Sequence, residues 1–246
     1  MPVKAYGAAE SPDRYRWDGG FSWIAHPQES MQRASHAIAV DDDGVPVAGR
    51  DVESEAVWVI EPLDFDRLDE ELRAFGPVAG VVVLAGLHRR DAAAVASRHG
   101  VEVHLSAPVG GLSKRLEAPT TVFGDTLADT GFRSIPVLYG IPWAEAMLFD
   151  DRTGTLVVTE ILTGSDRGTG PGERVAVAPY TRLIPPREPL AELSVQRLLL
   201  GHGPPVIDDA QAAVDHALAN SYRGLPAYLG RHLGFMLKAG YVALRD

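Results

Sequence analysis

Hydrophobic and polar residues alternate in short blocks along the chain, and glycine and proline separate the blocks. Eight apolar runs have the length and the β-branched content of strands that are buried on at least one face. These predicted strands are residues 21–25, 36–40, 56–60, 80–85, 101–105, 145–150, 155–160 and 196–201. Asp151 to Gly154 carry turn residues between two of the runs, which predicts a hairpin.

Helical patterns lie between the strands and at the end of the chain. Leu68, Leu72 and Phe75 repeat at helical spacing and mark a surface helix. The predicted helices span residues 64–75, the second part of 86–100, 208–221 and 225–240. Asp208 is the expected N-cap of the third helix, because its side chain can accept a hydrogen bond from the first turn. The order indicates an antiparallel start followed by a strand–helix–strand unit.

Composition limits the function classes. The chain has 246 residues, of which 46% are hydrophobic, so one domain with a large core is expected, with halves at about 15–125 and 126–246. A net charge of −10 argues against nucleic acid and anionic membranes as partners, because both require clustered Lys and Arg. The absence of cysteine excludes disulfides and thiolate ligands.

No apolar run reaches the length of a membrane span, and the N-terminus has no signal-like apolar region, so we expect a cytoplasmic protein. The glycine-rich segment 163–174 lacks the ending of a phosphate-binding loop and is predicted to be an exposed loop. Ser35 and His36 adjoin each other, but no nucleophile elbow accompanies them. The aromatic segment 17–23 is expected to pack in the first hairpin.

Residues 81–96, VVVLAGLHRRDAAAVA, run from an apolar strand through a charged turn into a small-residue helix. This segment, the segments SHAIAVDDDG, VWVIEPLD and MLFDDRTGTLVVTEILTG, and the ending RLLLGHGPPV occur in an order that resembles the metallo-β-lactamase-fold hydrolases over roughly residues 20–206. The resemblance implies a mixed α/β (α+β) fold, a four-layer αββα sandwich. It also implies that residues 84–91, 160 and 202 converge at one edge.

In that superfamily two zinc ions bind to a His-x-His-x-Asp-His motif and to later His and Asp residues, and they activate a bridging water. The motif falls on residues 86–91 of this chain, GLHRRD, where only His88 is retained. Gly86 removes the first His, and Arg90 replaces an Asp with a permanent cation that repels metal ions. No His occurs in residues 139–147, where the later His is expected.

The resemblance leaves four candidate ligands, which are His88, Asp91, Glu160 and His202. One interpretation is a mononuclear site for one zinc ion. The other, which we favour, is a buried polar network in which Arg90 pairs with Glu160 or Asp91 in place of a metal. The remaining histidines, His26, His36, His99, His104, His216 and His232, have no repeated ligand spacing and are assigned to loop, surface or core roles.

Two function classes follow from these interpretations. The first is a non-catalytic binding or regulatory protein with a degenerate metal site. The second is a metal-dependent hydrolase of an ester, thioester or lactone that uses one ion. A small-molecule ligand is compatible with both classes.

Overall fold

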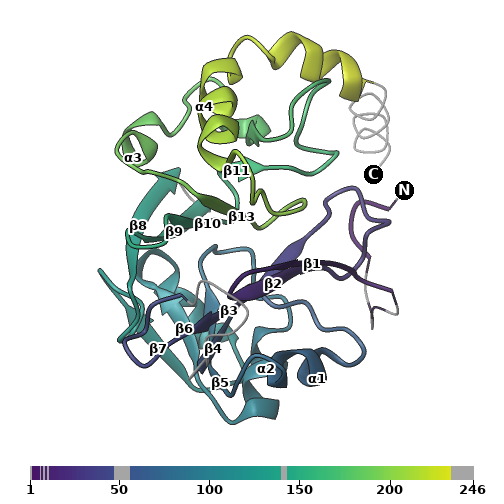
Figure 1. Cartoon of the computed structure of the whole chain (residues 1–246). Coiled ribbons are helices and arrows are strands. Elements are labelled where there is room, and N and C mark those ends of the chain that lie inside the picture. The colour runs from purple at the N-terminus through teal and green to yellow at the C-terminus, as the bar shows by residue number, and fades with distance from the viewer. Residues whose placement is uncertain are drawn as a thin grey trace.

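The computed structural model describes residues 2–5, 7, 9, 11–46, 56–139 and 143–233. Two large sheets lie next to each other within these residues, and helices cover their outer sides (Figure 1). The first sheet has seven strands in chain order: β1 (Asp13–Trp17), β2 (Gly20–Ile24), β3 (Ala34–Val40), β4 (Ala56–Ile60), β5 (Val78–Val83), β6 (Val103–Ser106) and β7 (Thr120–Phe123).

The first sheet changes from antiparallel to parallel pairing at β4. Strands β1 to β4 pair antiparallel, whereas β4 to β7 pair parallel. Two of the parallel connections contain the helices α1 (Leu68–Arg73) and α2 (Ala92–His99), and a third contains the 3₁₀ segment η1 (Ala107–Arg115). Parallel neighbours require such crossovers, so the antiparallel start and the later strand–helix pattern seen in the sequence are both realised.

The second sheet has the order β13-β10-β9-β8. Its strands are β8 (Phe132–Tyr139), β9 (Trp143–Asp150), β10 (Thr155–Val158) and β13 (Arg197–Leu200), and a small separate pair consists of β11 (Leu162–Thr163) and β12 (Ala176–Val177). Residues 151–154 form the predicted hairpin turn between β9 and β10. Strand β13 pairs parallel with β10, with Val158 opposite Leu200. The residues that follow these two strands therefore lie at the same edge of the second sheet.

Three buried clusters show the layers. Val81 and Val83 of β5 pack with Leu68, Leu72 and other residues of the helical side, because successive side chains of a strand point to opposite faces. Val82 instead packs with residues of the second sheet, among them Leu148 and Leu199. The third cluster joins the outer face of the second sheet to α3 (Arg187–Leu190) and α4 (Ala210–Asn220). The order is therefore helix, sheet, sheet, helix, as predicted.

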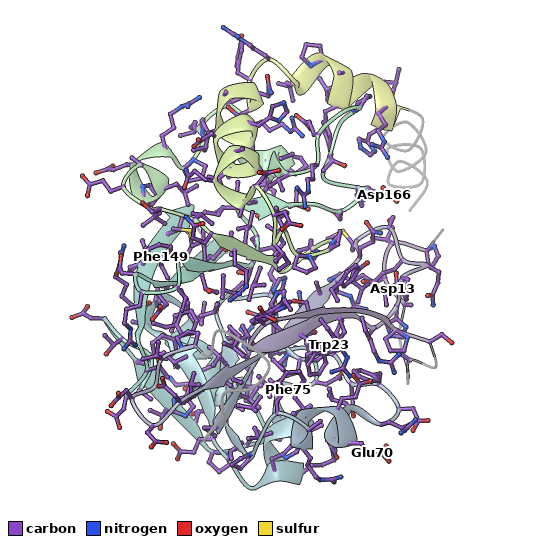
Figure 2. The ribbon with its side chains drawn as sticks, in the orientation of Figure 1. Asp13, Trp23, Glu70, Phe75, Phe149 and Asp166 are labelled. Atoms are coloured by element: carbon purple, nitrogen blue, oxygen red, sulfur yellow. The ribbon has the colours of Figure 1, made fainter. Side chains whose placement is uncertain are left out.

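Side chains fill the space between the layers, with Trp23 on the seven-stranded sheet and Phe149 on the four-stranded sheet (Figure 2). Trp23 is fully buried and donates from Nε1 to the backbone oxygen of Leu63 at 2.7 Å. Trp17 donates from Nε1 to Ser22 Oγ at 3.3 Å, so the aromatic residues of 17–23 pack in the first hairpin as expected.

Some predicted boundaries need correction. The first helix is shorter than the predicted 64–75, and the N-cap position of α4 is Asp209 rather than Asp208, without a side-chain capping bond. Residues 225–233 are helical, and the remainder of the predicted helix 225–240 lies outside the described residues. Within the described part of the chain, no helix combines the length and apolar character required to cross a bilayer.

Candidate metal centre

Three side chains from distant parts of the sequence meet where strands β5, β10 and β13 end. His88 lies in the turn between β5 and α2, Glu160 follows β10, and His202 follows β13. His88 Nε2 lies 2.6 Å from Glu160 Oε1, and His202 Nε2 lies 3.4 Å from the same oxygen. One ligand atom from each residue falls within 4.8 Å of the other two, so the geometry is compatible with one metal ion.

Both imidazoles have a second partner on their far side. His202 Nδ1 lies 2.9 Å from the backbone oxygen of Met31, an acceptor that requires a proton on Nδ1 and leaves the Nε2 lone pair facing the cluster. His88 Nδ1 lies 3.2 Å from Glu61 Oε2. Such partners fix the orientation of ligating histidines in metal sites.

Glycines let two loops approach His202 closely. A Cβ atom on Gly201 would lie 2.5 Å from the backbone oxygen of Thr159, and Gly203 has a φ of 93°. The backbone N–H of Gly164 donates to His202 O at 2.8 Å. The Gly-His-Gly sequence therefore allows the loop that carries Glu160 to lie directly against His202.

The charges of the cluster are strongly coupled. Burial raises the pKa of Glu160, but the neighbouring His202 and His88 imidazoles outweigh burial and hold that pKa far below its usual range. Burial and the charge of Arg90 lower the pKa of His88, but Glu61 and Glu160 together raise it above its ordinary value. Burial lowers the pKa of His202. The cluster thus combines an ionised carboxylate with one imidazole that favours a positive charge and one that favours neutrality.

Arg90 lies beside the cluster and connects both sheets. Its side chain is only 3% exposed, and it donates to the backbone oxygens of Ala34, Glu61 (2.9 Å) and Gly201 (3.0 Å). Its Nη2 lies 3.3 Å from His88 Nδ1. These contacts join the ends of β3, β4 and β13 through one guanidinium group.

The carboxylate partner of Arg90 differs from the expectation. None of the hydrogen bonds in the described part of the chain joins Arg90 to Glu160 or Asp91, so that expectation is wrong. The nearest paired carboxylate is Glu61, whose Oε2 lies 3.8 Å from Arg90 Nε. Both residues have left-handed backbone angles, with φ of 42° at Arg90 and 52° at Glu61, which non-glycine residues adopt mainly where the surroundings enforce it.

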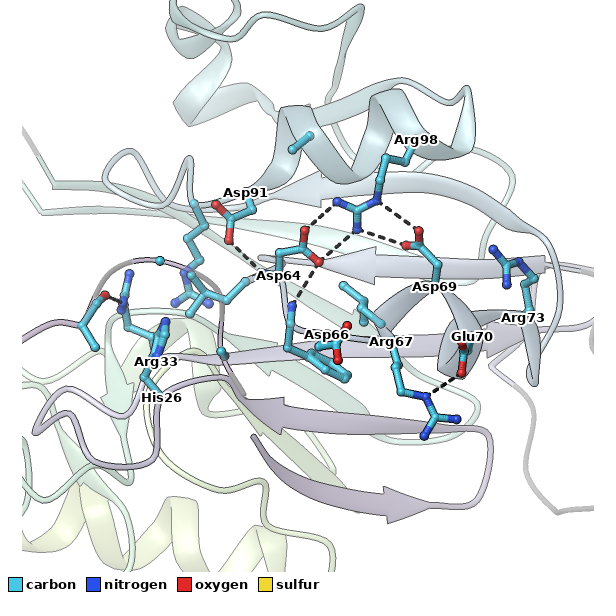
Figure 3. Close-up of a pocket in the computed structure, with 18 residues that line it drawn as sticks. His26, Arg33, Asp64, Asp66, Arg67, Asp69, Glu70, Arg73, Asp91 and Arg98 are labelled. Carbon is cyan, nitrogen blue, oxygen red and sulfur yellow. Dashed lines mark hydrogen bonds and ion pairs between the residues drawn. The ribbon is translucent and has the colours of Figure 1, made fainter. Parts of the chain in front are cut away.

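Asp91 and His88 line different pockets. Asp91 Oδ2 accepts a hydrogen bond from the backbone N–H of Asp64 at 2.8 Å, and Asp91 lines a separate pocket of about 1020 Å³ (Figure 3). Ion pairs cross that pocket, including those of Arg98 with Asp64 and Asp69. Asp91 is thus not part of the His88–Glu160–His202 cluster, contrary to its assignment as a fourth ligand.

Comparisons with known proteins identify the fold. Neither a family model nor a curated protein matches the sequence. Among solved structures, TMB-1 superposes with a TM-score of 0.56 at 15% identity, covering 86% of this chain and 97% of that one. DIM-1 metallo-β-lactamase gives a TM-score of 0.57 at 14% identity, covering 87% and 98%.

A fragment of the putative diflavin flavoprotein A 5 from Nostoc sp. PCC 7120 gives a TM-score of 0.60 at 14% identity, with 88% of this chain and 98% of that chain covered. At such low identities, the superpositions establish the arrangement of the layers alone. The chain has the metallo-β-lactamase fold.

Within the metallo-β-lactamase fold, the turn after β5 offers only one side chain to the cluster. Gly86 has no side chain, and its backbone N–H donates to Ala144 O at 3.1 Å. Arg90, in the same turn, has a buried side chain that carries a positive charge and therefore supplies no metal ligand. The donor set of two imidazole nitrogens and one carboxylate oxygen fits one zinc-like ion, because these are the ligand types of catalytic zinc sites with an open fourth position.

Glu145 is a functional candidate that the sequence analysis missed. It is 3% exposed, and its Oε1 accepts hydrogen bonds from Thr159 N, Thr159 Oγ1 and Glu160 N at 2.8–2.9 Å. Its Oε2 accepts from Ile161 N at 3.1 Å. Burial raises the pKa of Glu145 to about 7, although the bonds from Glu160 and Thr159 oppose the shift. Glu145 therefore holds the loop that positions Glu160.

Glu61 and Tyr180 were also missed. Tyr180 donates from its hydroxyl to Glu160 Oε2 at 3.0 Å, which leaves Oε1 directed at the histidines. Glu61 Oε1 accepts from the backbone N–H groups of Leu84 and Ala85. The acidic residue directly after the apolar run 56–60 was a usable signal for Glu61, whereas nothing local in the sequence distinguishes Tyr180.

The remaining predictions have mixed outcomes. His36 is neutral and structural, because its ring contacts Ser22 Oγ at 2.8 Å and Leu200 O at 3.1 Å, and burial lowers its pKa to about 3. Ser35 Oγ donates to Glu61 O, so it is not paired with His36 as a nucleophile.

The segment 163–174 is not simply exposed, since Ser165 and Thr169 are buried.

A pocket of about 300 Å³ opens beside the cluster. His88, Glu160 and His202 line one part of it, and the segment around Ser165 lines another. Glu160 is the one acidic residue among the described residues that line this pocket. A molecule in the pocket would therefore contact the candidate ligand atoms directly.

Proposed function

We propose that this protein binds one divalent metal ion, zinc being the best match, and holds a small molecule beside it. His88 Nε2, Glu160 Oε1 and His202 Nε2 are the proposed ligands. The observation that carries the proposal is the convergence of these three atoms within 4.8 Å, with Met31 O and Glu61 orienting the two imidazoles from outside.

A second ion is not part of the proposal. Gly86 supplies no ligand, Asp91 points into the other pocket, and the Arg90 guanidinium lies 3.3 Å from His88 Nδ1. A fixed cation beside the cluster disfavours a second divalent ion by direct repulsion. The metal site is in this sense degenerate, and the two-ion hydrolysis implied by the family resemblance is not expected here.

Ligand binding without catalysis is the first candidate activity. Apart from the three proposed ligands, the described residues that line the 300 Å³ pocket include no carboxylate and no imidazole that can move a proton. Tyr180 is already engaged with Glu160. A binding or regulatory role accounts for a pocket whose described lining residues, apart from the proposed ligands, include no carboxylate or imidazole base.

Hydrolysis of an ester, thioester or lactone is the second candidate. It is supported by the three-ligand set, because zinc with an open position lowers the pKa of a bound water and polarises carbonyl groups. In this case His88, Glu160 and His202 would hold the ion, and the pocket would orient the acyl group. Zinc-dependent turnover of simple aryl esters that is lost in His202→Ala would favour this candidate over binding alone.

Metal stoichiometry tests the proposal. We expect elemental analysis and calorimetric titration of the full chain to give close to one zinc ion, and His88→Ala or His202→Ala to abolish binding. His216→Ala is the matched control, because His216 lies exposed on α4 and contacts Asn220. Two ions per chain, or undiminished zinc binding in His202→Ala, would contradict the proposed site.

A further inference from the structure

The pocket beside the cluster has an apolar rim. Leu87 is 53% exposed and Tyr180 is 48% exposed, and both line this pocket of about 300 Å³. Met31, Ala178 and Pro179 continue the same lining. Exposed large apolar side chains that gather at a concave site are typical of a surface that a ligand covers.

The N-terminal segment is fixed next to this rim by a buried ion pair. Glu29 is fully buried and pairs with Arg33 at 2.8 Å. Glu29 Oε2 accepts from the backbone N–H of Ala5 at 2.9 Å, while Arg33 Nη2 donates to Ala5 O at 2.7 Å. One residue of the N-terminal segment is thus held by both members of the pair.

Two backbone hydrogen bonds extend this attachment. Ser30 N donates to Pro2 O at 2.9 Å, and Met31 N donates to Val3 O at 3.3 Å. Lys4 lies between the attached residues and lines the pocket with an exposed side chain. The backbone on both sides of Lys4 is therefore held beside the pocket, within a segment that has no regular secondary structure.

The charge of the pocket differs from that of the whole protein. The chain has a net charge of −10 and only three lysines, at positions 4, 114 and 238. Lys4 and Arg167 line the pocket, and Glu160 is the one acid among its described lining residues. Both oxygens of Glu160 are engaged, Oε1 by the histidines and Oε2 by Tyr180. A negatively charged group on a ligand thus meets a cation at the mouth.

We propose that this pocket binds a small monocarboxylate with a short apolar body, whose apolar part contacts Leu87 and Tyr180 and whose carboxylate pairs with Lys4. The inference deepens the proposed function and rests on it for the assignment of this pocket as the ligand site. One carboxylate suffices because Lys4 is a single point charge with three donors. The apolar side chains of Leu87, Ala178 and Pro179 offer a further negative charge no partner on that wall of the pocket.

Calorimetric titration with sodium hexanoate tests the proposal on the full chain after chelator treatment, so that a bound ion cannot capture the carboxylate. We expect hexanoate to bind, and hexan-1-ol to bind at least about fivefold more weakly. We expect Lys4→Met to lower the affinity for hexanoate by about fivefold, the scale of a partly exposed ion pair. Lys114→Met is the matched control, because Lys114 is exposed and does not line the pocket.

A second pair of variants tests the apolar wall. Leu87→Asp should lower the affinity for hexanoate by about fivefold or more, because the change removes apolar contact and adds a charge that repels the carboxylate. Leu183→Asp, at a residue that is 65% exposed and does not line the pocket, should leave binding unchanged. The proposal is wrong if Lys4→Met binds hexanoate as tightly as the unmodified chain, or if hexan-1-ol binds equally well.

Zinc titration of the same variants separates the two proposals. Lys4→Met and Leu87→Asp should retain one zinc ion per chain, because neither residue supplies a ligand atom. Lys4-dependent hexanoate binding without any zinc binding would overturn the metal site alone. Zinc binding together with hexanoate binding that requires zinc and ignores Lys4 would overturn the carboxylate assignment alone.

Discussion

His88 and His202 face each other with their Nε2 atoms 3.3 Å apart, although 114 residues separate them in the sequence. Each ring is oriented from behind, His88 by Glu61 and His202 by the backbone of Met31. Two imidazole nitrogens at this distance, beside an ionised carboxylate, favour a shared cation. The buried Arg90 lies next to this pair, with Nη2 3.3 Å from His88 Nδ1.

Arg90→Ala is predicted to destabilise the protein by about 3–5 kcal/mol, the usual cost of removing one member of a buried ionic network. The change leaves the oxygens of Ala34, Glu61 and Gly201 without the guanidinium donor and leaves Glu61 without its cation. Urea unfolding at neutral pH measures the loss. Arg89→Ala is the control, since Arg89 is exposed; equal stability of the two variants would show that Arg90 does not hold the sheets together.

Tyr180→Phe is predicted to weaken zinc binding by about tenfold, the scale reported for lost outer hydrogen bonds to metal ligands. The hydroxyl fixes Glu160 Oε2, and without it the carboxylate can rotate away from the histidines. Competition with a zinc chelator gives the affinity. Tyr222→Phe, at a residue that is 68% exposed, should bind zinc normally, and an unchanged affinity in Tyr180→Phe would remove Tyr180 from the site.

Glu145→Gln is predicted to lower stability by about 1–3 kcal/mol, because an amide NH₂ group must then face a backbone N–H donor of residues 159–161. It should also weaken zinc binding through the displaced Glu160 loop. Urea unfolding and zinc titration measure both effects. Full stability with normal zinc affinity would show that the loop does not depend on Glu145.

The pKa of Glu145 also predicts a pH effect. Burial raises this pKa to about 7 in the folded protein from 4.5, so the folded state binds more protons between these values. Glu145 therefore contributes stability below about pH 4.5 that is lost as the pH rises toward 7. The difference in unfolding free energy between the unmodified chain and Glu145→Gln should change with pH across this window, and a constant difference would contradict the shift.

His36 predicts the opposite trend. Burial lowers the pKa of His36 to about 3 from 6.5, so the unfolded state binds more protons between these values. Stability should therefore fall as the pH drops from 6.5 toward 3, by about 1.4 kcal/mol per pH unit from this group. His36→Gln should flatten the acid side of the stability profile measured by urea unfolding. An acid slope as steep as that of the unmodified chain would mean that other groups cause it.

The sequence by itself determined the strands, because their apolar runs are buried in the folded protein. Val81, Val82 and Val83 alternate between two cores, and residues 56–60 needed no distant information to be recognised as a strand. His202 was found from the family resemblance, through the Gly-His ending of the last apolar run, and the structure adds that glycines on both sides allow close backbone approach. His88 and Glu160 were found from the family resemblance, with the correct position in the chain.

Only the tertiary structure decided which charged groups meet. Arg90 and Asp91 are adjacent in the sequence and both line the larger pocket, yet they have different partners, because Arg90 donates to Gly201 O and Asp91 accepts from the backbone N–H of Asp64. The partners of Arg90 lie 29 to 111 residues away along the chain, apart from His88. Glu61, Glu145 and Tyr180 join the site through contacts of the same kind. Local sequence patterns report burial and backbone preference, whereas long-range hydrogen bonds depend on how the two sheets are packed.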